Sequence, residues 1–194
     1  MVENEITLDR ISEARKYREK VKRLNGANLI YENEKGEILF GKSNFPSETD
    51  GKYRFMLPGG GIDRGEHPRH AACTEMAEET GIHFYEKDIE LVGLMMQIVR
   101  GVAETNGVVF LYRAKVFAGE PSPSQELGEF KYFSHKEIID LVGCPDRDTI
   151  GLGYLRMVCH YINWKQSNQA APFETRLSDP VSISGDVHAP LLTV

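Results

Sequence analysis

Four glutamates recur at fixed intervals between residues 60 and 82, in a segment opened and closed by glycines. The segment begins Gly60-Gly61-Ile62-Asp63-Arg64-Gly65-Glu66 and resumes, seven residues later, as Thr74-Glu75-Met76-Ala77-Glu78-Glu79-Thr80-Gly81-Ile82. Hard divalent cations prefer carboxylate and water oxygens as ligands, and they bridge readily to substrate phosphates. The spacing therefore predicts a site that holds a divalent cation beside a phosphate group.

A helix over residues 68–80 must position three of these carboxylates. Pro68 suits its first position and Gly81 suits the residue just past its end. At 100° per residue the three helical glutamates fall within an arc of about 100°, and the other side gathers Ala72, Cys73, Met76 and Ala77. We therefore expect an apolar face that packs inward and a second face that presents three carboxylates. Like charges at these spacings repel, and Mg²⁺ or Mn²⁺ would offset that repulsion.

An acidic helix face in solvent is the ordinary alternative, because such faces are common. The glycine-rich opening, Glu66 and the Gly81 stop at matching intervals favour a functional site over that alternative.

Alternating strands and helices surround this helix. Strands are expected at residues 27–31, 37–41, 54–57, 90–100, 108–116 and 131–133. Further helices are expected at 8–24, at 135–142 after the N-cap Ser134, and at 148–165, with Leu152, Leu155, Val158, Cys159 and Ile162 buried. The domain organisation is then an N-terminal helix in residues 1–24, one domain over 25–165 and a C-terminal tail over 166–194, either mobile or laid across the domain.

The composition favours a cytoplasmic protein. Of the 194 residues, 41% are hydrophobic and 27% are charged, and no apolar run approaches the length of a membrane span. The N-terminus lacks a signal-peptide pattern, and the odd cysteines Cys73, Cys144 and Cys159 fit a reducing compartment. The net charge of −6 argues against an extended nucleic acid as partner. A small anionic substrate remains compatible with it, since local cations can offset its charge.

The glutamate segment resembles the signature box of the Nudix hydrolases. That box runs Gly, five residues, Glu, seven residues, Arg-Glu, an aliphatic residue, any residue, Glu-Glu, any residue, Gly and an aliphatic residue. The chain supplies Gly60, Glu66, Glu75, Met76, Glu78, Glu79, Gly81 and Ile82 at those positions. It departs at Thr74, where the family has arginine. With the flanking strands and helix, the resemblance extends over roughly residues 25 to 165.

The resemblance implies an α+β fold, an αβα sandwich around a mixed sheet. It implies hydrolysis of a diphosphate linkage in a nucleoside diphosphate derivative or nucleotide, with Mg²⁺ or Mn²⁺ as cofactor. By residue-wise carry-over, Glu75, Glu78 and Glu79 ligate the metal. Glu66 assists directly or through water, and the Gly60 carbonyl is a further ligand. The implied partner is a small-molecule nucleotide, and frequent dimerisation among relatives allows a homodimer.

Other candidate residues lie outside the box. In many relatives a glutamate before the last short strand is the general base, and here Glu126 is the first choice and Glu129 the second, with plain loop carboxylates as an equal alternative. Lys42, Arg54 and Arg100 lie at strand ends and are candidates for binding substrate phosphates, against the simpler interpretation that they cap strands in solvent.

Thr74 cannot tie down a catalytic glutamate as the family arginine does. We expect reduced or substrate-restricted activity, with His70, one turn earlier, as a partial substitute. The alternative from another functional class is a Nudix-fold nucleotide-binding or regulatory module with weak or no hydrolase activity.

Overall fold

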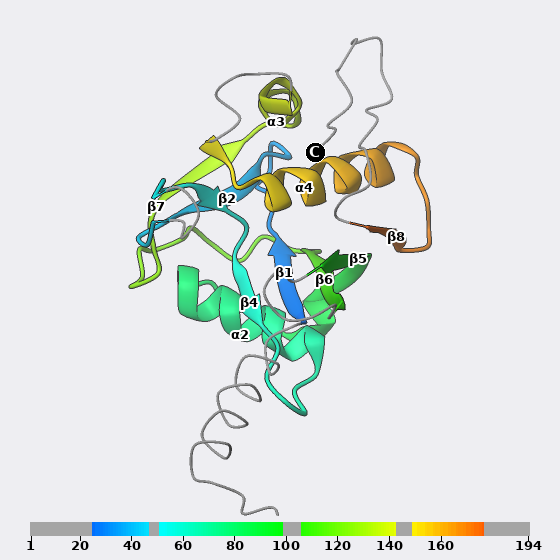
Figure 1. Cartoon of the computed structure of the whole chain (residues 1–194), viewed down its shortest axis with the longest axis horizontal. Coiled ribbons are helices and arrows are strands. Elements are labelled where there is room, and N and C mark those ends of the chain that lie inside the picture. Colours follow the sequence, from blue (N-terminus) through cyan, green and yellow to red (C-terminus); the bar gives the residue numbers. More distant parts are fainter. Residues whose placement is uncertain (1–24, 47–50, 99–105, 143–148, 177–194) are drawn as a thin grey trace, which may run out of the picture.

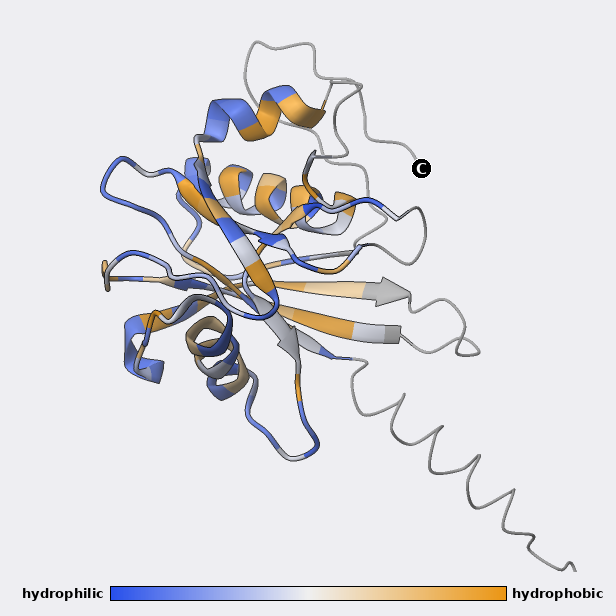
Figure 2. Ribbon diagram, turned by 90° about the vertical axis from the view of Figure 1, so that its left-hand side faces the viewer, coloured by the Kyte–Doolittle hydropathy of each residue, from blue (hydrophilic) through white to orange (hydrophobic). Residues whose placement is uncertain are grey.

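Helices cover both sides of two β-sheets (Figure 1). The computed structural model describes residues 25–46, 51–98, 106–142 and 149–176. Helix α2 (Pro68–Thr80) lies on one side, and α3 (His135–Val142) and α4 (Leu152–Gln166) lie on the other (Figure 2). This arrangement confirms the predicted α+β class and the αβα sandwich. The expected N-terminal helix of residues 1–24 lies outside the described residues.

The larger sheet is mixed, as predicted. Its strands, in spatial order, are β4 (Gly59–Gly61), β1 (Gly26–Ile30), β6 (Asn106–Ala114), β5 (Ile89–Ile98) and β8 (Phe173–Arg176). The β1–β6 and β5–β8 pairs are parallel, and the β4–β1 and β6–β5 pairs are antiparallel. The smaller sheet is antiparallel and contains β3 (Phe55–Met56), β2 (Ile38–Ser43) and β7 (Leu127–Phe133).

Strand β1 separates two hydrophobic cores. Successive side chains of a strand point to opposite faces, so Ala27 and Leu29 pack in the cluster under α2. Ile30 packs instead in the cluster under α3 and α4. Asn28 lies two residues before Ile30 and therefore points to the same face of the sheet, toward α4. It is a polar residue in an otherwise apolar strand. This alternation places one amide on the α4 side of the larger sheet.

The sequence predicts α3 and its cap correctly. Ser134 Oγ accepts a hydrogen bond from the Glu137 N–H at 3.2 Å, and Glu137 Oε2 accepts one from the Ser134 N–H at 2.8 Å. This reciprocal pair is a capping box, which satisfies two backbone donors that the first helical turn leaves without partners.

Several elements differ from the prediction. Strand β7 begins at Leu127 rather than at residue 131, because it pairs along the length of β2. The glycines at 59–61, for which no strand is expected, form edge strand β4, because β1 offers them a pairing partner. Helix α4 begins at Leu152 rather than at residue 148, which leaves Leu152 42% exposed instead of buried. Residues 173–176, expected in an irregular tail, add β8 to the sheet beside β5. None of the helices in the described part of the chain has the length and apolarity required to span a bilayer.

Candidate active site

Helix α2 has the boundaries predicted from its sequence. Pro68 is its first residue, and His67 Nδ1 accepts a hydrogen bond from the Arg69 N–H at 3.2 Å. At the other end Gly81 has a φ of 73°, and its N–H donates to the Ala77 carbonyl at 2.9 Å. A left-handed residue just past a helix end favours glycine. Because α2 packs on β1 and β4, these two caps fix where its glutamates meet the sheet edge.

Glu79 is buried, unlike a glutamate on the acidic, solvent-exposed helix face that was the ordinary alternative. It is 3% exposed, and its Oε2 accepts a hydrogen bond from the Gly59 N–H at 2.7 Å. Burial raises the pKa of the Glu79 carboxyl to about 8, against the opposing effect of the Gly59 hydrogen bond. The neighbouring carboxylates Glu75, Glu126 and Glu78 raise that pKa as well. The spacing of residues around the helix does not predict this burial, because it contains no information about where β4 lies.

The Glu75 carboxylate occupies the space that a side chain at position 60 would need. A Cβ built on Gly60 would lie within 2.6 Å of Glu75 Oε2, far inside van der Waals contact. Glu75 is partly buried in this position. Gly60 thus allows the carboxylate to lie directly against the β4 backbone, beside the Gly59 N–H that binds Glu79.

The other two predicted ligands lie in more open surroundings. Glu78 is exposed, and Glu66 Oε2 accepts a hydrogen bond from the Asp63 N–H at 2.9 Å. Among the described residues, no group of three or more His, Cys, Asp or Glu side chains is arranged to hold a metal ion. A shared cation would therefore require the more exposed carboxylates to turn toward Glu79, a rotation that is open to flexible side chains.

The two candidate general bases lie in different places. Glu126 is exposed immediately before β7, and its charge is one of those that raise the pKa of Glu79. Glu129 lies within β7 opposite Lys42, and its Oε2 is 3.3 Å from Lys42 Nζ. The structure therefore brings Glu126 within electrostatic range of the α2 carboxylates and directs Glu129 to an ion pair.

A sequence model of the NUDIX domain matches residues 22–150, which include α2 and all strands from β1 to β7. The chain belongs to the Nudix hydrolase family. This confirms the resemblance drawn from the glutamate segment, and it makes the protein an enzyme of the pyrophosphohydrolase class.

Two curated relatives illustrate the similarity. The RNA pyrophosphohydrolase of Bartonella quintana is 30% identical over 134 residues, which cover 60% of this chain and 76% of the relative. The RNA pyrophosphohydrolase of Rhizobium meliloti is 57% identical over 37 residues, which cover only 19% of this chain and 22% of that protein.

Solved structures share the fold of this Nudix chain. The MutT protein from Methanosarcina mazei Go1 has a TM-score of 0.54 at 21% identity, covering 74% of this chain and 94% of the other. A NUDIX hydrolase from Nitrosomonas europaea has a TM-score of 0.55 at 18% identity, covering 78% and 76%. At these identities the likeness concerns the fold alone.

Thr74, at the position of the family arginine, is partly buried. It lines a cavity of about 630 Å³ between α2 and residues 83–86, together with Glu78. His70, the expected substitute, lines the same cavity, and its Nδ1 lies 3.3 Å from Glu86 Oε1. Its role as a partial substitute for the arginine stays a prediction.

The three predicted phosphate-binding cations are Lys42, Arg54 and Arg100. Lys42 pairs with Glu129 across the β2–β7 ladder. Arg54 is partly buried directly before β3, and Arg100 lies outside the described residues. A role for these residues in binding substrate stays a prediction.

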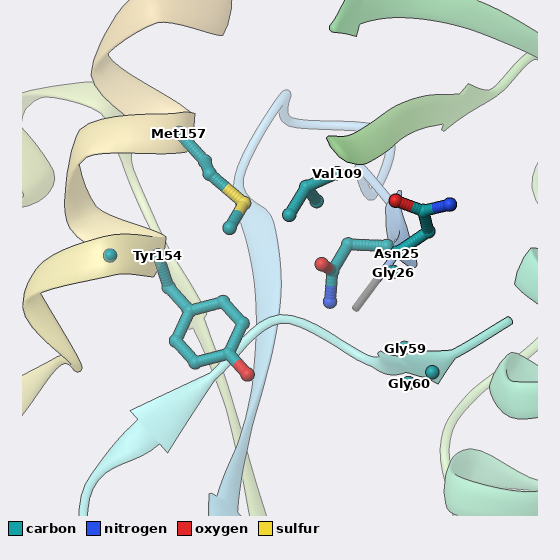
Figure 3. Close-up of a pocket in the computed structure, with 10 residues that line it drawn as sticks. Asn25, Gly26, Gly59, Gly60, Val109, Tyr154 and Met157 are labelled. Carbon is teal, nitrogen blue, oxygen red and sulfur yellow. The ribbon is translucent and has the colours of Figure 1, made fainter. Parts of the chain in front are cut away.

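Two residues that sequence reasoning did not single out, Asn28 and Tyr154, line a cavity of about 380 Å³ (Figure 3). Burial raises the pKa of the Tyr154 phenol to about 12, and the charge of Glu79 acts in the same direction, so the phenol lies near that carboxylate. A polar residue within the apolar strand β1 was the available signal for Asn28. Tyr154 had none, because its position depends on how α4 packs.

Proposed function

We propose that this Nudix enzyme carries out Mg²⁺-dependent hydrolysis of a diphosphate linkage in a nucleotide or nucleoside diphosphate derivative. The observation that carries the proposal is the crowding of carboxylates at the β4 edge. Glu79 is buried there with its pKa raised to about 8, and three more carboxylates act on it. Concentrated negative charge of this kind favours a divalent cation.

The donor set fits a hard cation. Glu75, Glu78 and Glu79 offer carboxylate oxygens, Glu66 offers a fourth, and the Gly60 carbonyl lies on the same edge strand. Oxygen donors of this kind suit Mg²⁺, and Mn²⁺ accepts them too. When bound, the metal would neutralise diphosphate oxygens and lower the pKa of a bound water.

The chain itself positions the reactants. The Gly59 N–H holds the Glu79 carboxylate, and Gly60 leaves room for the Glu75 carboxylate. Glu126 then takes a proton from the attacking water. The water oxygen bonds to phosphorus, and the bridging P–O bond breaks to release the leaving phosphate. Because Glu126 is exposed before β7, it can reach a water at the open side of the site.

Replacing each glutamate in turn shows whether Glu126 or Glu129 is the general base. Glu126→Gln should lower kcat about 10²-fold, the usual contribution of a positioned general base. Glu129→Gln is the matched control three residues later and should change kcat less than about threefold, since Glu129 is engaged by Lys42. Steady-state phosphate release measures both, and equal effects of the two variants would refute the assignment.

Restoring the arginine at position 74 should raise activity. Thr74→Arg places a guanidinium one turn before the exposed Glu78, at the i,i+4 spacing that supports an ion pair. We expect kcat to rise about fivefold, as a charged hydrogen bond holds that carboxylate in place. Thr74→Gln, of similar length without charge, is the control. Unchanged kcat and unchanged Mg²⁺ dependence in the arginine variant would show that the position does not matter.

A substrate panel tests the function itself. The protein is incubated with ADP-ribose, dinucleoside polyphosphates, nucleoside triphosphates and a short RNA with a 5′-triphosphate, each with Mg²⁺ and with EDTA. The RNA is included because the curated relatives are RNA pyrophosphohydrolases. Metal-dependent release of phosphate or a monophosphate supports the enzyme. Binding without release would favour the regulatory module instead.

The proposed substrates are small nucleotides in a reducing, cytoplasmic setting. The described cysteines, Cys73 and Cys159, are free thiols. The net charge of −6 disfavours binding along an extended nucleic-acid backbone. The 5′ end of an RNA would present only a short stretch of that backbone to the protein.

A further inference from the structure

Residues 57 and 58 carry the chain from the smaller sheet to the larger one. Strand β3 ends at Met56 and β4 begins at Gly59, so Leu57 and Pro58 belong to neither strand. Both residues are buried. A buried carbonyl needs a hydrogen-bond donor, and the Leu57 carbonyl lies outside the ladders of either sheet. The crossing therefore needs a donor that the two ladders do not supply.

Asn28 supplies that donor from β1. The residue is only 6% exposed, and its Nδ2 lies 3.4 Å from the Leu57 carbonyl oxygen and 3.3 Å from that of Pro58. Two carbonyl partners identify this end of the amide as the nitrogen, whose two N–H groups can serve both. The Pro58 carbonyl also accepts a hydrogen bond from the Leu29 N–H at 3.0 Å. Two successive residues of β1 thus hold the Pro58 carbonyl in place.

Gly59 lies directly against the same amide. It is opposite Asn28 in the β4–β1 register, and its φ of 143° is open to glycine but strained for other residues. A Cβ built on Gly59 would lie 2.5 Å from Asn28 Nδ2, closer than a carbon and a nitrogen can approach without a bond. This contact leaves the peptide between Pro58 and Gly59 little freedom to rotate.

The two ends of that peptide bind different groups. Its carbonyl oxygen, on Pro58, accepts from Asn28. Its N–H, on Gly59, donates to Glu79 Oε2 at 2.7 Å. The described peptide bonds are all trans, and a trans peptide is planar, so its C=O and N–H point in opposite directions and turn together. Holding the carbonyl therefore fixes the direction of the N–H that binds the buried carboxylate, and hydrogen bonds in such a chain also polarise one another.

We propose that Asn28 is a positioning residue, which orients the Glu79 carboxylate at the β4 edge through the Pro58–Gly59 peptide. Strand β1 is otherwise apolar, and burying an amide costs free energy unless the amide is hydrogen-bonded. The amide of Asn28 therefore serves to hold the backbone rather than to fill the core. This role rests on the proposed function, in which Glu79 is a metal ligand.

Removing the amide should slow turnover. Asn28→Ala should lower kcat about tenfold, as the loss of a group that orients a metal ligand does, and it should change KM less than about threefold. Asn33→Ala is the matched control. The Asn33 side chain also organises backbone, in the turn between β1 and β2, beyond the part of β1 that pairs with β4. The control should lose stability but keep kcat within about twofold. Equal losses of kcat in both variants would overturn the proposal.

The loss should also depend on the carboxylate that Asn28 positions. In a Glu79→Gln background, Asn28→Ala should lower the residual kcat less than about twofold, because residues that act through one another give non-additive effects. An undiminished loss in that background would place the action of Asn28 elsewhere and overturn the proposal.

A second measurement does not depend on turnover. In metal-free ¹⁵N-labelled protein the Gly59 amide proton should move upfield in Asn28→Ala, since a weaker hydrogen bond shields the proton, and should keep its position in Asn33→Ala. Glu79→Gln should in turn shift the side-chain amide of Asn28, a test that also serves if the alanine variant does not fold. Both results stand even if no nucleotide is hydrolysed, in which case the proposed function fails alone. A Gly59 resonance unmoved by Asn28→Ala, or an Asn28 amide unmoved by Glu79→Gln, would refute the positioning role whatever the activity.

Discussion

Glu79→Gln should reduce kcat about 10³-fold. A charge that stabilises a transition state through a bound cation is worth several kcal/mol, and each 1.4 kcal/mol is about a factor of ten in rate. The neutral amide keeps the size of the side chain and can still accept the hydrogen bond from Gly59. Substrate hydrolysis under saturating Mg²⁺ measures the loss. Glu86→Gln, an exposed change beside α2, should leave kcat within about twofold.

The same substitution should stabilise the metal-free protein at alkaline pH. The folded-state pKa of Glu79 is raised from 4.5 to about 8, so its contribution to stability is fully present below pH 4.5. It is lost as the pH rises through 8 and the buried carboxyl ionises. The loss is on the order of a few kcal/mol, at about 1.4 kcal/mol per pKa unit. Glutamine does not titrate, so Glu79→Gln should escape this loss.

Thermal unfolding in EDTA at pH 5 and pH 9 provides the measurement. The wild type should lose more Tm between these pH values than the glutamine variant, and Mg²⁺ at pH 9 should restore the wild type alone, because ligand binding to the folded state stabilises it. A wild type and variant with parallel Tm profiles would contradict the burial of an ionisable Glu79. Equal stabilisation of both by Mg²⁺ would contradict its role in metal binding.

Gly60→Ala is expected to lower kcat about 10²-fold with little change in Tm. The added methyl would overlap the Glu75 carboxylate, and that carboxylate is the end of a flexible side chain which can move aside at small cost in stability. Displacing a group that orients a metal or substrate costs activity by one to two orders of magnitude. Phosphate release and calorimetry on the same preparation test both parts of the expectation.

A double-mutant cycle shows whether Gly60 acts through Glu75. If it does, Gly60→Ala combined with Glu75→Gln should be no slower than Glu75→Gln alone, since coupled residues give non-additive effects. Full additivity of the two losses would mean that the methyl disturbs something else, such as the approach of substrate to β4. A large drop in Tm for Gly60→Ala would point to the pairing of β4 with β1.

The sequence predicts the helix ends near the site, because these depend on residues that are adjacent in the chain. Pro68 and Gly81 bound α2 because caps act within one turn, and Ser134 predicted α3 for the same reason. Which glutamate is buried depends instead on β4, a strand of three glycines that has no strand propensity of its own. Its pairing with β1 spans more than thirty residues of chain, and no local pattern reveals such a contact.

The choice between Glu126 and Glu129 shows the same limit. Both lie in one short segment, and no local pattern separates a base from a plain loop carboxylate there. The start of β7 at Leu127 and its register against β2 decide that Glu129 faces Lys42. Tyr154 is a still longer-range case, because it reaches the β4 edge only through the packing of α4 over the sheet.

Helix α4 begins just beyond residue 150, where the match to the family ends. The glutamates belong to the matched segment, whereas Tyr154 and Met157 belong to the helix on its C-terminal side. The charge of Glu79 nevertheless raises the pKa of the Tyr154 phenol. A helix beyond the matched segment therefore contributes to the surroundings of the glutamate site.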